Sequence, residues 1–377
     1  IVIDDPAWKK IDATTGFIQQ SPDEGKPATE KTEVKIMFSD ENLYVAVICY
    51  HDDPEKIIIS DARRDSPLDD MDSFIFILDT FRDYQNGYAF GTNAAGIEYD
   101  AQITKGGEGG STSRRFSMGA GGGYNINWDA AWNVKSFIGD FGWSAEFEIP
   151  LKTLRYNSKK DQTWGINFQR VISSNQEKAH WSQITRQFTV NRLVSAGQLV
   201  GIEIPSSRSY KIIPYVLGQA NAVSDSSDRN TNDSDLGLDA KINIGSSLTL
   251  DMTYNTDFAQ AEADEQQINL DRFSLYFPEK RAFFLENAGL FSIGENTRRG
   301  SELSMFFSRR IGIGDDGQQI PIMAGGRLTG TFSNMRIGLL SMSTKSEEFS
   351  IFRVKKEMPN RTFFGAMATN MLNLNSD

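Results

Sequence analysis

Hydrophobic residues alternate with polar ones along most of this chain, and the three-to-four-residue spacing typical of an amphipathic helix is scarce. Val34, Ile36 and Phe38 share one face of a predicted strand, which a turn joins to the apolar run 43–50. Residues 74–78 are all apolar, which indicates a central strand covered on both faces. The pattern therefore predicts an all-β protein.

Alternation of the same kind continues to about residue 205. Trp143 and Trp164 each begin an alternating segment, and these positions assign both rings to the core. Several short strands with frequent turn signals predict a β-sandwich over residues 1–205. The glycine-rich stretch 106–123 lacks the ending of a phosphate-binding loop and is expected to form a surface loop. The serine-rich stretch 206–209 is expected to be a linker.

The second half alternates over longer segments. Residues 236–254 and 324–343 each predict a hairpin with strands of about ten residues and a tight turn, enough for a tilted strand to cross a membrane. The opposite connections are longer and polar, as in 222–234. A second soluble sandwich would show the same alternation, so the pattern alone leaves both architectures open.

Composition narrows the choice of function. The chain has 377 residues, more than one domain usually holds, and a net charge of −11. This acidic balance excludes a nucleic-acid binder, which needs a basic surface to displace counterions. The mean hydropathy of −0.41 does not exclude a membrane protein built from strands, because only every second residue of such a strand is apolar. The single cysteine, Cys49, lies in an apolar run and is expected to be a buried thiol.

A family resemblance separates the two architectures. The segments 255–270 (NTDFAQAEADEQQINL), 272–273 (RF) and 277–286 (FPEKRAFFLE) closely resemble a family of Gram-negative outer-membrane proteins known as domain of unknown function 5916. Residues 308–312 and 324–330 resemble further blocks of that family. The family also has an amino-terminal module that is similar to family 9 carbohydrate-binding modules. The segments that resemble this module are 40–46, 78–81, 128–132, 142–143 and 164–168.

The resemblance implies a location in the cell outer membrane. Residues 206–377 are then the first part of an antiparallel transmembrane β-barrel, with about eight candidate strands, and the sandwich over 1–205 is periplasmic or barrel-associated. The last residues, 374–377, lack the aromatic terminus typical of such barrels, so a longer protein is expected. The expected partners are outer-membrane lipid, a glycan ligand and an envelope protein complex.

The expected role is non-enzymatic, in envelope transport or glycan recognition. A soluble or surface glycan-binding protein with two β domains is the alternative. A glycoside hydrolase is a third class, and Glu146, Glu148 and Asp129 supply carboxylates for it. An acidic chain offers many such pairs, and His51 and His180 lack the spacing of a metal-binding motif, so no catalytic residue is assigned.

The stretch at about 257–303 does not resemble a lipid-facing strand. Its charges would be costly against hydrocarbon, so we expect a segment folded inside the barrel as a plug, although a long exterior loop would also tolerate them. The plug is favoured because neighbouring aromatic residues need burial. The charged residues assigned to this plug-like insert are Asp264, Glu265, Asp271, Arg272, Glu279, Lys280, Arg281 and Glu286.

Two further kinds of site are weighed in the first half. Aromatic rings with nearby polar groups suit sugars, and the candidates are Trp128, Trp132, Trp181 and Tyr84, although core packing explains a tryptophan equally well. Asp69, Asp70 and Asp72 form an acidic cluster that is a candidate for a structural calcium. A solvated acidic turn neutralised by neighbouring arginines is the alternative. No other cofactor is expected.

Overall fold

The computed structural model divides the chain into two compact units, Ile1–Ser206 and Ser207–Asp377. It contains no helix, among the residues it describes, that is long and apolar enough to cross a membrane. The described residues are 6–107, 123–126, 128–156, 161–204, 210–221, 231–244, 248–256, 279, 281–285, 288–291, 305–313, 320–332, 335–358 and 362–374.

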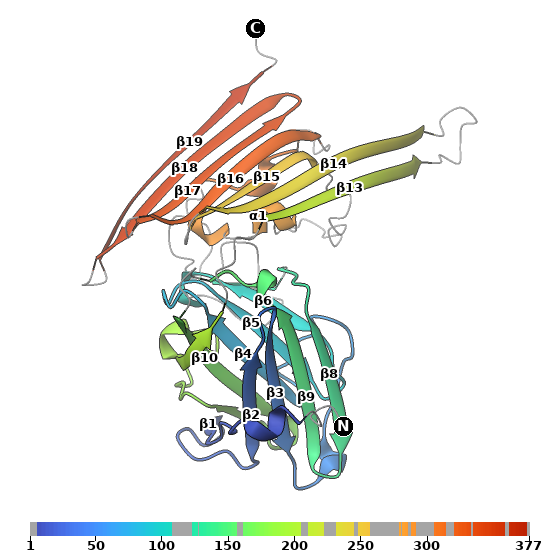
Figure 1. Cartoon of the computed structure of the whole chain (residues 1–377), viewed down its shortest axis with the longest axis vertical. Coiled ribbons are helices and arrows are strands. Elements are labelled where there is room, and N and C mark those ends of the chain that lie inside the picture. The colour runs from blue at the N-terminus through green and yellow to red at the C-terminus, as the bar shows by residue number, and fades with distance from the viewer. Residues whose placement is uncertain are drawn as a thin grey trace, which may run out of the picture. The chain divides into compact units, whose positions relative to one another are not determined.

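The first unit consists of two antiparallel sheets (Figure 1). The larger sheet has the order β1-β11-β10-β4-β5-β6-β7, and β12 also pairs with β10. Its strands are β1 (Ile18–Ser21), β4 (Ser73–Asp79), β5 (Gly87–Asn93), β6 (Tyr99–Ile103), β7 (Tyr124–Asn125), β10 (Asp161–Ile172), β11 (Glu177–His180) and β12 (Gly197–Glu203). The smaller sheet, in the order β2-β3-β9-β8, consists of β2 (Thr32–Phe38), β3 (Asn42–Tyr50), β8 (Asn133–Gly139) and β9 (Gly142–Pro150).

Short 3₁₀ turns connect some of these strands. They are η1 (Trp8–Lys10), η2 (Pro54–Lys56), η3 (Lys105–Gly107), η4 (Leu151–Thr153), η5 (Ser173–Asn175) and η6 (Leu193–Ser195). Gly106 and Gly107, which fall in the predicted glycine-rich loop, are buried in η3, so this end of the stretch is not at the surface. Residues 108–122 and the predicted linker 206–209 lie outside the described residues.

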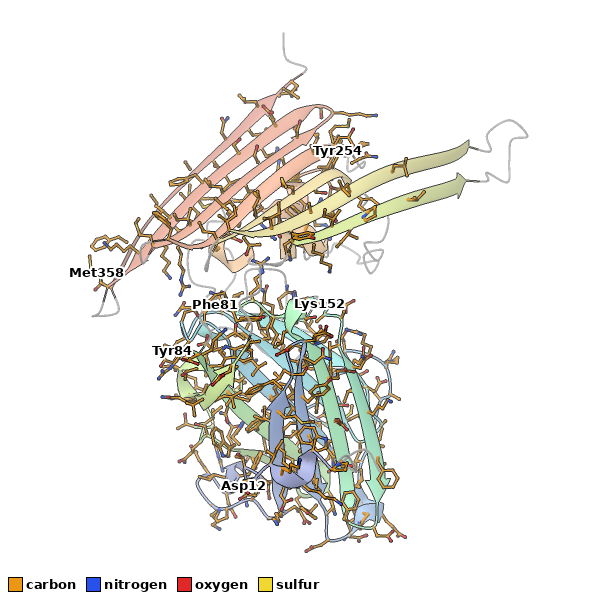
Figure 2. All side chains as sticks on the ribbon, viewed as in Figure 1. Asp12, Phe81, Tyr84, Lys152, Tyr254 and Met358 are labelled. Carbon is orange, nitrogen blue, oxygen red and sulfur yellow. The ribbon has the colours of Figure 1, made fainter. Side chains whose placement is uncertain are left out.

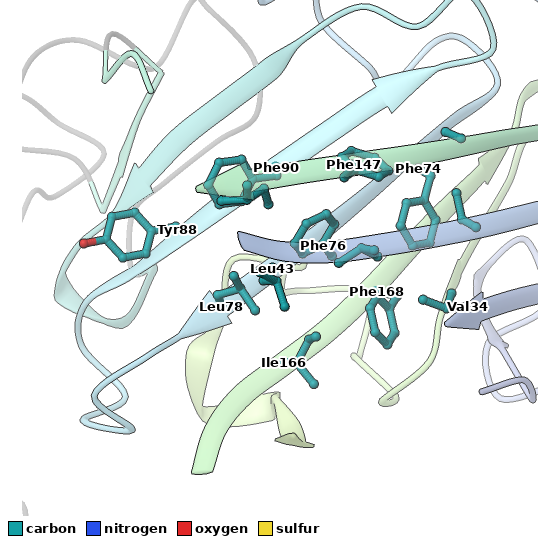
Figure 3. Close-up of a cluster of buried hydrophobic side chains, with 14 of the residues drawn as sticks. Val34, Leu43, Phe74, Phe76, Leu78, Tyr88, Phe90, Phe147, Ile166 and Phe168 are labelled. Atoms are coloured by element: carbon teal, nitrogen blue, oxygen red, sulfur yellow. The ribbon is translucent and has the colours of Figure 1, made fainter. Parts of the chain in front are cut away.

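Strand β4 is central to the sandwich, between β10 and β5, as its unbroken apolar run predicts. Phe74, Phe76 and Leu78 face the core shared with the smaller sheet (Figure 3). Ile75 and Ile77 point the other way, into a second core that connecting segments complete. Both faces of β4 are therefore covered, and burying its alternate side chains on both faces is what requires every position to be apolar.

The predicted hairpin of β2 and β3 forms, with Val34 opposite Val47. Trp143 and Trp164 lie in the core, fully buried, as their alternation predicts. Cys49 is also fully buried, and burial raises the pKa of its thiol to about 12. This thiol is therefore a small core residue and not a nucleophile.

The second unit is built on one antiparallel sheet in which each strand pairs with the next along the chain (Figure 1). Its strands are β13 (Tyr210–Asn221), β14 (Thr231–Ile244), β15 (Leu248–Thr256), β16 (Ile322–Phe332), β17 (Met335–Thr344), β18 (Glu347–Glu357) and β19 (Phe363–Asn373). The described residues thus contain seven strands here, where the alternation predicts about eight. Among them, β13 and β19 are the edges of an open sheet and do not pair with each other.

The connections between these strands mostly follow the predicted asymmetry. At one end of the sheet, β14 and β15, β16 and β17, and β18 and β19 are separated by at most five residues, and at the other end the separations 222–230 and 257–321 are longer. The two-residue turn between β17 and β18 is the exception, because it lies at the end of the long connections.

Part of the longest connection returns to the sheet. Its described elements are α1 (Ala282–Leu285), η7 (Ala288–Phe291) and η8 (Ser308–Arg310). Phe284, Phe291 and Ile311 pack with Leu340 and Met342 of β17 in a compact apolar cluster. This connection therefore covers one face of the sheet, and the sheet's other face has a different composition.

Candidate functional sites

One face of the seven-stranded sheet carries a row of apolar residues that runs from edge to edge. The strand register aligns one residue from every strand, from β13 to β19, in the row Tyr210, Ile242, Leu250, Leu328, Leu339, Phe352 and Ala368. Tyr210 is 76% exposed and Phe352 is 44% exposed. Tyr254, labelled in Figure 2, lies on the same face and is 61% exposed. A soluble monomer rarely exposes so extended an apolar surface.

The covered face carries charges in the adjacent row. Asp251 Oδ2 accepts hydrogen bonds from Arg327 Nη2 at 2.7 Å and from Arg327 Nε at 3.2 Å. Lys241 Nζ lies 3.6 Å from the other oxygen, Oδ1. Both Asp251 and Arg327 are buried. The covered face thus combines these buried charges with the apolar cluster around Leu340 and Met342, whereas the opposite face carries the exposed apolar row.

The covering connection is tied down by a second buried ion pair. Arg281 Nε and Nη2 each lie 2.7 Å from one oxygen of Glu279. Arg281 also donates to the carbonyl oxygens of Ile311 at 2.6 Å and Ser308 at 2.7 Å, and the Ser308 hydroxyl donates to Glu279 at 2.7 Å. These acceptors all belong to the same connection, so the pair helps to fix the fold of the cover.

Glu279 and Arg281 are two of the eight charged residues assigned to the plug-like insert. Both are buried, at 1% and 9% exposure. The other six, which lie outside the described residues, are Asp264, Glu265, Asp271, Arg272, Lys280 and Glu286.

The four aromatic candidates for sugar stacking have different surroundings in the sandwich. Trp132 is 4% exposed and stacks on Phe147 with centroids 5.7 Å apart, so it is a core residue and presents no open face. Trp181 contacts Phe168 and lies against Gly197, where a side chain would collide with its ring. These two rings pack inward because apolar residues of the neighbouring strands surround them.

Trp128 and Tyr84 remain closer to solvent. Trp128 is half-buried, with ring centroids 5.0 Å from Tyr88 and 6.1 Å from Phe90. Tyr84 is 41% exposed (Figure 2), in a left-handed conformation with φ of 57°. Asp79 accepts the backbone N–H of Tyr84 at 2.8 Å and thereby holds this conformation. Burial, followed by the charge of Asp83, raises the pKa of Asp79 to about 7.

Arg64 is the centre of a carboxylate cluster beside Trp128. From the sequence alone it is only one of the arginines that could neutralise the acidic turn. Arg64 Nη2 lies 2.7 Å from Asp100 and 2.5 Å from Asp129, and Arg64 also pairs with Glu98. Asp100 is fully buried and accepts the indole N–H of Trp132 at 3.2 Å. Burial raises the pKa of Asp100 to about 7. These residues lie up to 65 positions apart, so only the fold could reveal the cluster.

The three candidate calcium ligands do not converge. Asp69 pairs with Lys178 at 2.7 Å, Asp70 is exposed, and Asp72 is buried and accepts the backbone N–H of Ile58 at 2.9 Å. Across the described part of the chain, no group of three or more acidic, histidine or cysteine side chains is arranged to hold a metal ion. The predicted calcium site is therefore wrong in its geometry, because the start of β4 turns Asp72 inward.

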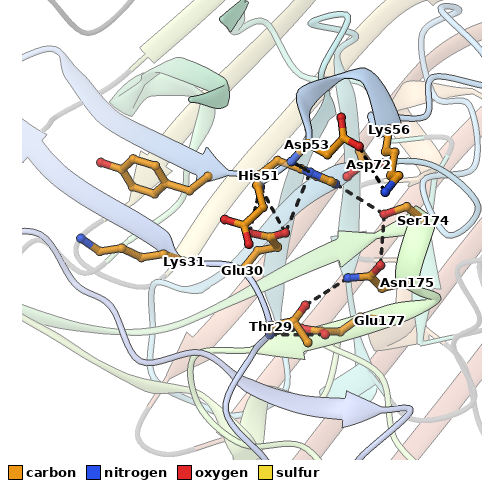
Figure 4. Close-up of polar contacts among 12 residues, drawn as sticks. Thr29, Glu30, Lys31, His51, Asp53, Lys56, Asp72, Ser174, Asn175 and Glu177 are labelled. Atoms are coloured by element: carbon orange, nitrogen blue, oxygen red, sulfur yellow. Dashed lines mark hydrogen bonds and ion pairs between the residues drawn. The ribbon is translucent and has the colours of Figure 1, made fainter. Parts of the chain in front are cut away.

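Histidine His51 lies in a polar network between β3 and η5 (Figure 4). Its Nε2 is 3.4 Å from the Ser174 hydroxyl, and its Nδ1 is 3.9 Å from Glu30. This resembles the order of a serine-histidine-acid triad, but the backbone N–H of Asp53 donates to Nδ1 at 3.1 Å. Nδ1 is then unprotonated and Nε2 carries the proton, so the ring in this tautomer cannot accept a proton from Ser174.

The other polar candidates are engaged separately. His180 is fully buried, and burial lowers its pKa to about 3, so it stays neutral. Of the carboxylates considered for hydrolysis, Glu146 accepts from Trp8 at 3.4 Å, Glu148 accepts from Asn42 at 3.1 Å, and Asp129 pairs with Arg64.

Comparison with known proteins adds a family match for part of the chain. Residues 207–323 match the family described as "Domain of unknown function (DUF5916)". The matched range begins at the first residue of the second unit and includes β13 to β15 together with the covering connection. No curated protein matches the chain.

Two solved structures are similar to part of the chain. A family 9 carbohydrate-binding module from Caldicellulosiruptor kristjanssonii, in complex with cellotriose, is 14% identical, with a TM-score of 0.36 over 54% of this chain and 87% of that one. A carbohydrate-binding protein from Bacteroides uniformis is 13% identical, with a TM-score of 0.38 over 51% of this chain and 87% of that one.

Proposed function

We propose that the second unit is part of the wall of an outer-membrane β-barrel, non-enzymatic in role and acting in envelope transport. The supporting observation is the apolar row from Tyr210 to Ala368, which runs across all seven described strands. Strands of nine to fourteen residues are long enough to cross the hydrocarbon layer when tilted. In this arrangement the apolar face contacts lipid, and the charged face lines the interior.

The exposure of the apolar row favours this proposal over a second soluble sandwich. A sandwich needs another protein layer on its apolar face, and the described cover, from Phe284 to Ile311, packs on the opposite face. A membrane wall also requires that β13 and β19 be paired, because unpaired backbone groups are not tolerated in hydrocarbon. We place the sandwich in the periplasm, as the resemblance implies.

Arginine substitutions at two depths of one strand test the lipid contact. Leu339 lies near the middle of β17 on the apolar face, and Met335 lies at its end on the same face. In a membrane, Leu339→Arg is expected to cost about 2–4 kcal/mol and Met335→Arg about 0–1 kcal/mol, because the cost of a charge depends on depth. The measurement is the urea dependence of folded, heat-modifiable full-length protein in lipid vesicles.

The soluble alternative predicts a different outcome for the same pair. Substitutions on a water-facing surface usually change stability by less than about 0.5 kcal/mol, whatever their depth along the strand. Equal, small effects of both variants, in a chain that stays monomeric in water without detergent, would exclude the membrane wall.

We further propose that the sandwich recognises a glycan at Trp128. The specific observation is that this half-buried ring lies one residue from Asp129, whose side chain is 76% exposed and pairs with Arg64. A ring face with nearby donors and acceptors is what a pyranose needs.

The glycan proposal is tested on an oligosaccharide array that includes cellotriose and acidic sugars. Trp128→Ala is expected to weaken binding roughly tenfold, since a stacked ring contributes about 0.5–1.5 kcal/mol beyond the area it buries. Phe137→Ala is the matched control, because Phe137 is an exposed aromatic residue of β8 in the other sheet. Unchanged affinity in Trp128→Ala would remove this site.

A further inference from the structure

One arginine on the covered face of the seven-stranded sheet lacks an acidic partner. Arg353 of β18 is 7% exposed, and within the described part of the chain its one hydrogen bond runs from Nη1 to the carbonyl oxygen of Ala366, at 3.2 Å. Its Nε is buried without a partner. Arg281 and Arg327, by contrast, each pair with a buried carboxylate. Arg353 is thus a buried cation that no carboxylate in the described residues neutralises.

The backbone around Arg353 leaves space for its guanidinium group. Gly365 of β19 lies so close that a Cβ there would be 2.8 Å from Nη1, so glycine leaves the room that the group occupies. On the other side, Gly338 is opposite Arg353 in the β17–β18 register and lies under Leu290 and Phe291 of η7. Arg353 therefore lies between two strands that each carry a glycine beside it, and it is only 7% exposed.

A buried charge without a counter-charge is costly, and native proteins keep one where a ligand completes the arrangement. We infer that Arg353 is the binding residue for an oxyanion, a carboxylate or a phosphate group, carried by a solute on the covered face of the sheet. A planar guanidinium suits either group, because two N–H donors can bond two oxygens at once. The inference rests on the proposed function, in which this face lines the interior.

The position of Arg353 also identifies the source of the anion. Arg353 lies next in sequence to Phe352, and strand alternation puts the two side chains on opposite faces. Phe352 belongs to the apolar row, so Arg353 points away from the surface assigned to lipid. The oxyanion therefore comes from a solute and not from a lipid headgroup.

The test uses the full chain in maltoside micelles, which contain no phosphate, with inorganic phosphate and acetate as separate calorimetric probes. Wild-type protein is expected to bind at least one of them, and Arg353→Gln is expected to weaken that binding about tenfold or more. Arg353→Lys keeps the charge and should retain part of the affinity. Lys356→Gln is the control, since it removes an exposed charge of the same strand.

Two outcomes would overturn the inference. One is the absence of binding by wild-type protein at millimolar phosphate and acetate, and the other is equal affinity in Arg353→Gln and wild type. If both Arg353 variants fail to fold, the wild type alone decides, because a bound oxyanion must raise its unfolding temperature above that in chloride of equal ionic strength. The lipid test with Leu339 and Met335 is independent, so a failure here leaves the membrane proposal standing.

Discussion

Replacing Arg281 with methionine is expected to lower the free energy of unfolding of the second unit by about 3–5 kcal/mol, because it leaves Glu279 as a buried and unpaired charge. The variant also lacks the hydrogen bonds from Arg281 to the carbonyl oxygens of Ser308 and Ile311. These bonds join two distant parts of the covering connection. Its guanidinium lies 4.3 Å from the ring centroid of Phe284, and methionine would keep only part of that contact.

The measurement can separate the two units within one protein. All six tryptophans belong to the first unit, so tryptophan fluorescence reports the unfolding of the sandwich alone. Far-ultraviolet circular dichroism reports the strands of both units, so the part of its transition that does not coincide with the fluorescence belongs to the second unit. Arg281→Met should shift that part along the urea axis and leave the fluorescence transition in place.

A double variant distinguishes a buried pair from a surface pair. Glu279→Leu combined with Arg281→Met removes both charges and should recover most of the stability, since apolar replacements of buried pairs are often neutral. If Arg281→Met lowers the free energy of unfolding by less than about 1 kcal/mol, the ion pair behaves as a solvent-exposed one, and the cover does not bury it.

Replacing Trp132 with alanine is expected to destabilise the first unit by about 3–5 kcal/mol, the usual range for emptying a large aromatic site in a core. The ring contacts Phe147 and Phe90, with centroids 5.7 Å and 5.3 Å away. Its indole N–H also donates to Asp100, a buried carboxyl that loses one of its donors in the variant. Urea unfolding followed by the fluorescence of the remaining tryptophans measures the loss.

The conservative variant separates the two contributions of this ring. Trp132→Phe keeps an aromatic side chain in the core but removes the N–H donor to Asp100, and it should cost roughly 1–3 kcal/mol. If Trp132→Ala changed stability by less than about 0.5 kcal/mol, the ring would be at the surface and again a candidate for sugar stacking.

The burial of the tryptophans follows from the sequence pattern at some positions and not at others. Trp143 and Trp164 lie on strands with clear alternation, so their burial follows from the pattern. Trp128 and Trp132 lie before β8 in a segment with no regular period, and the chain gives no signal that one ring is buried and the other is partly open. Phe90 of β5 contacts both rings, and Phe147 of β9 stacks on Trp132.

For the charged residues, the sequence pattern predicts the face of the sheet but not the partner. Strand alternation predicts that Asp251 and Arg327 lie on the face opposite the apolar row. It does not predict that they pair, because they are 76 positions apart and meet through the β15–β16 register after a long connection. Asp69, Asp70 and Asp72 show the opposite case. They are close in sequence but do not converge on a metal site, because their side chains point in different directions at the start of a strand.

Alternation along the chain was enough to predict an all-β fold and the two faces of its strands, because a strand's side chains alternate with a period of two whatever its partners are. Which charges find partners followed from the folded chain alone, as in Arg64 with Asp100, Arg281 with Glu279, and Arg353 with none among the described carboxylates. Pairing requires a few ångströms of separation, and chain folding, not sequence spacing, sets that distance.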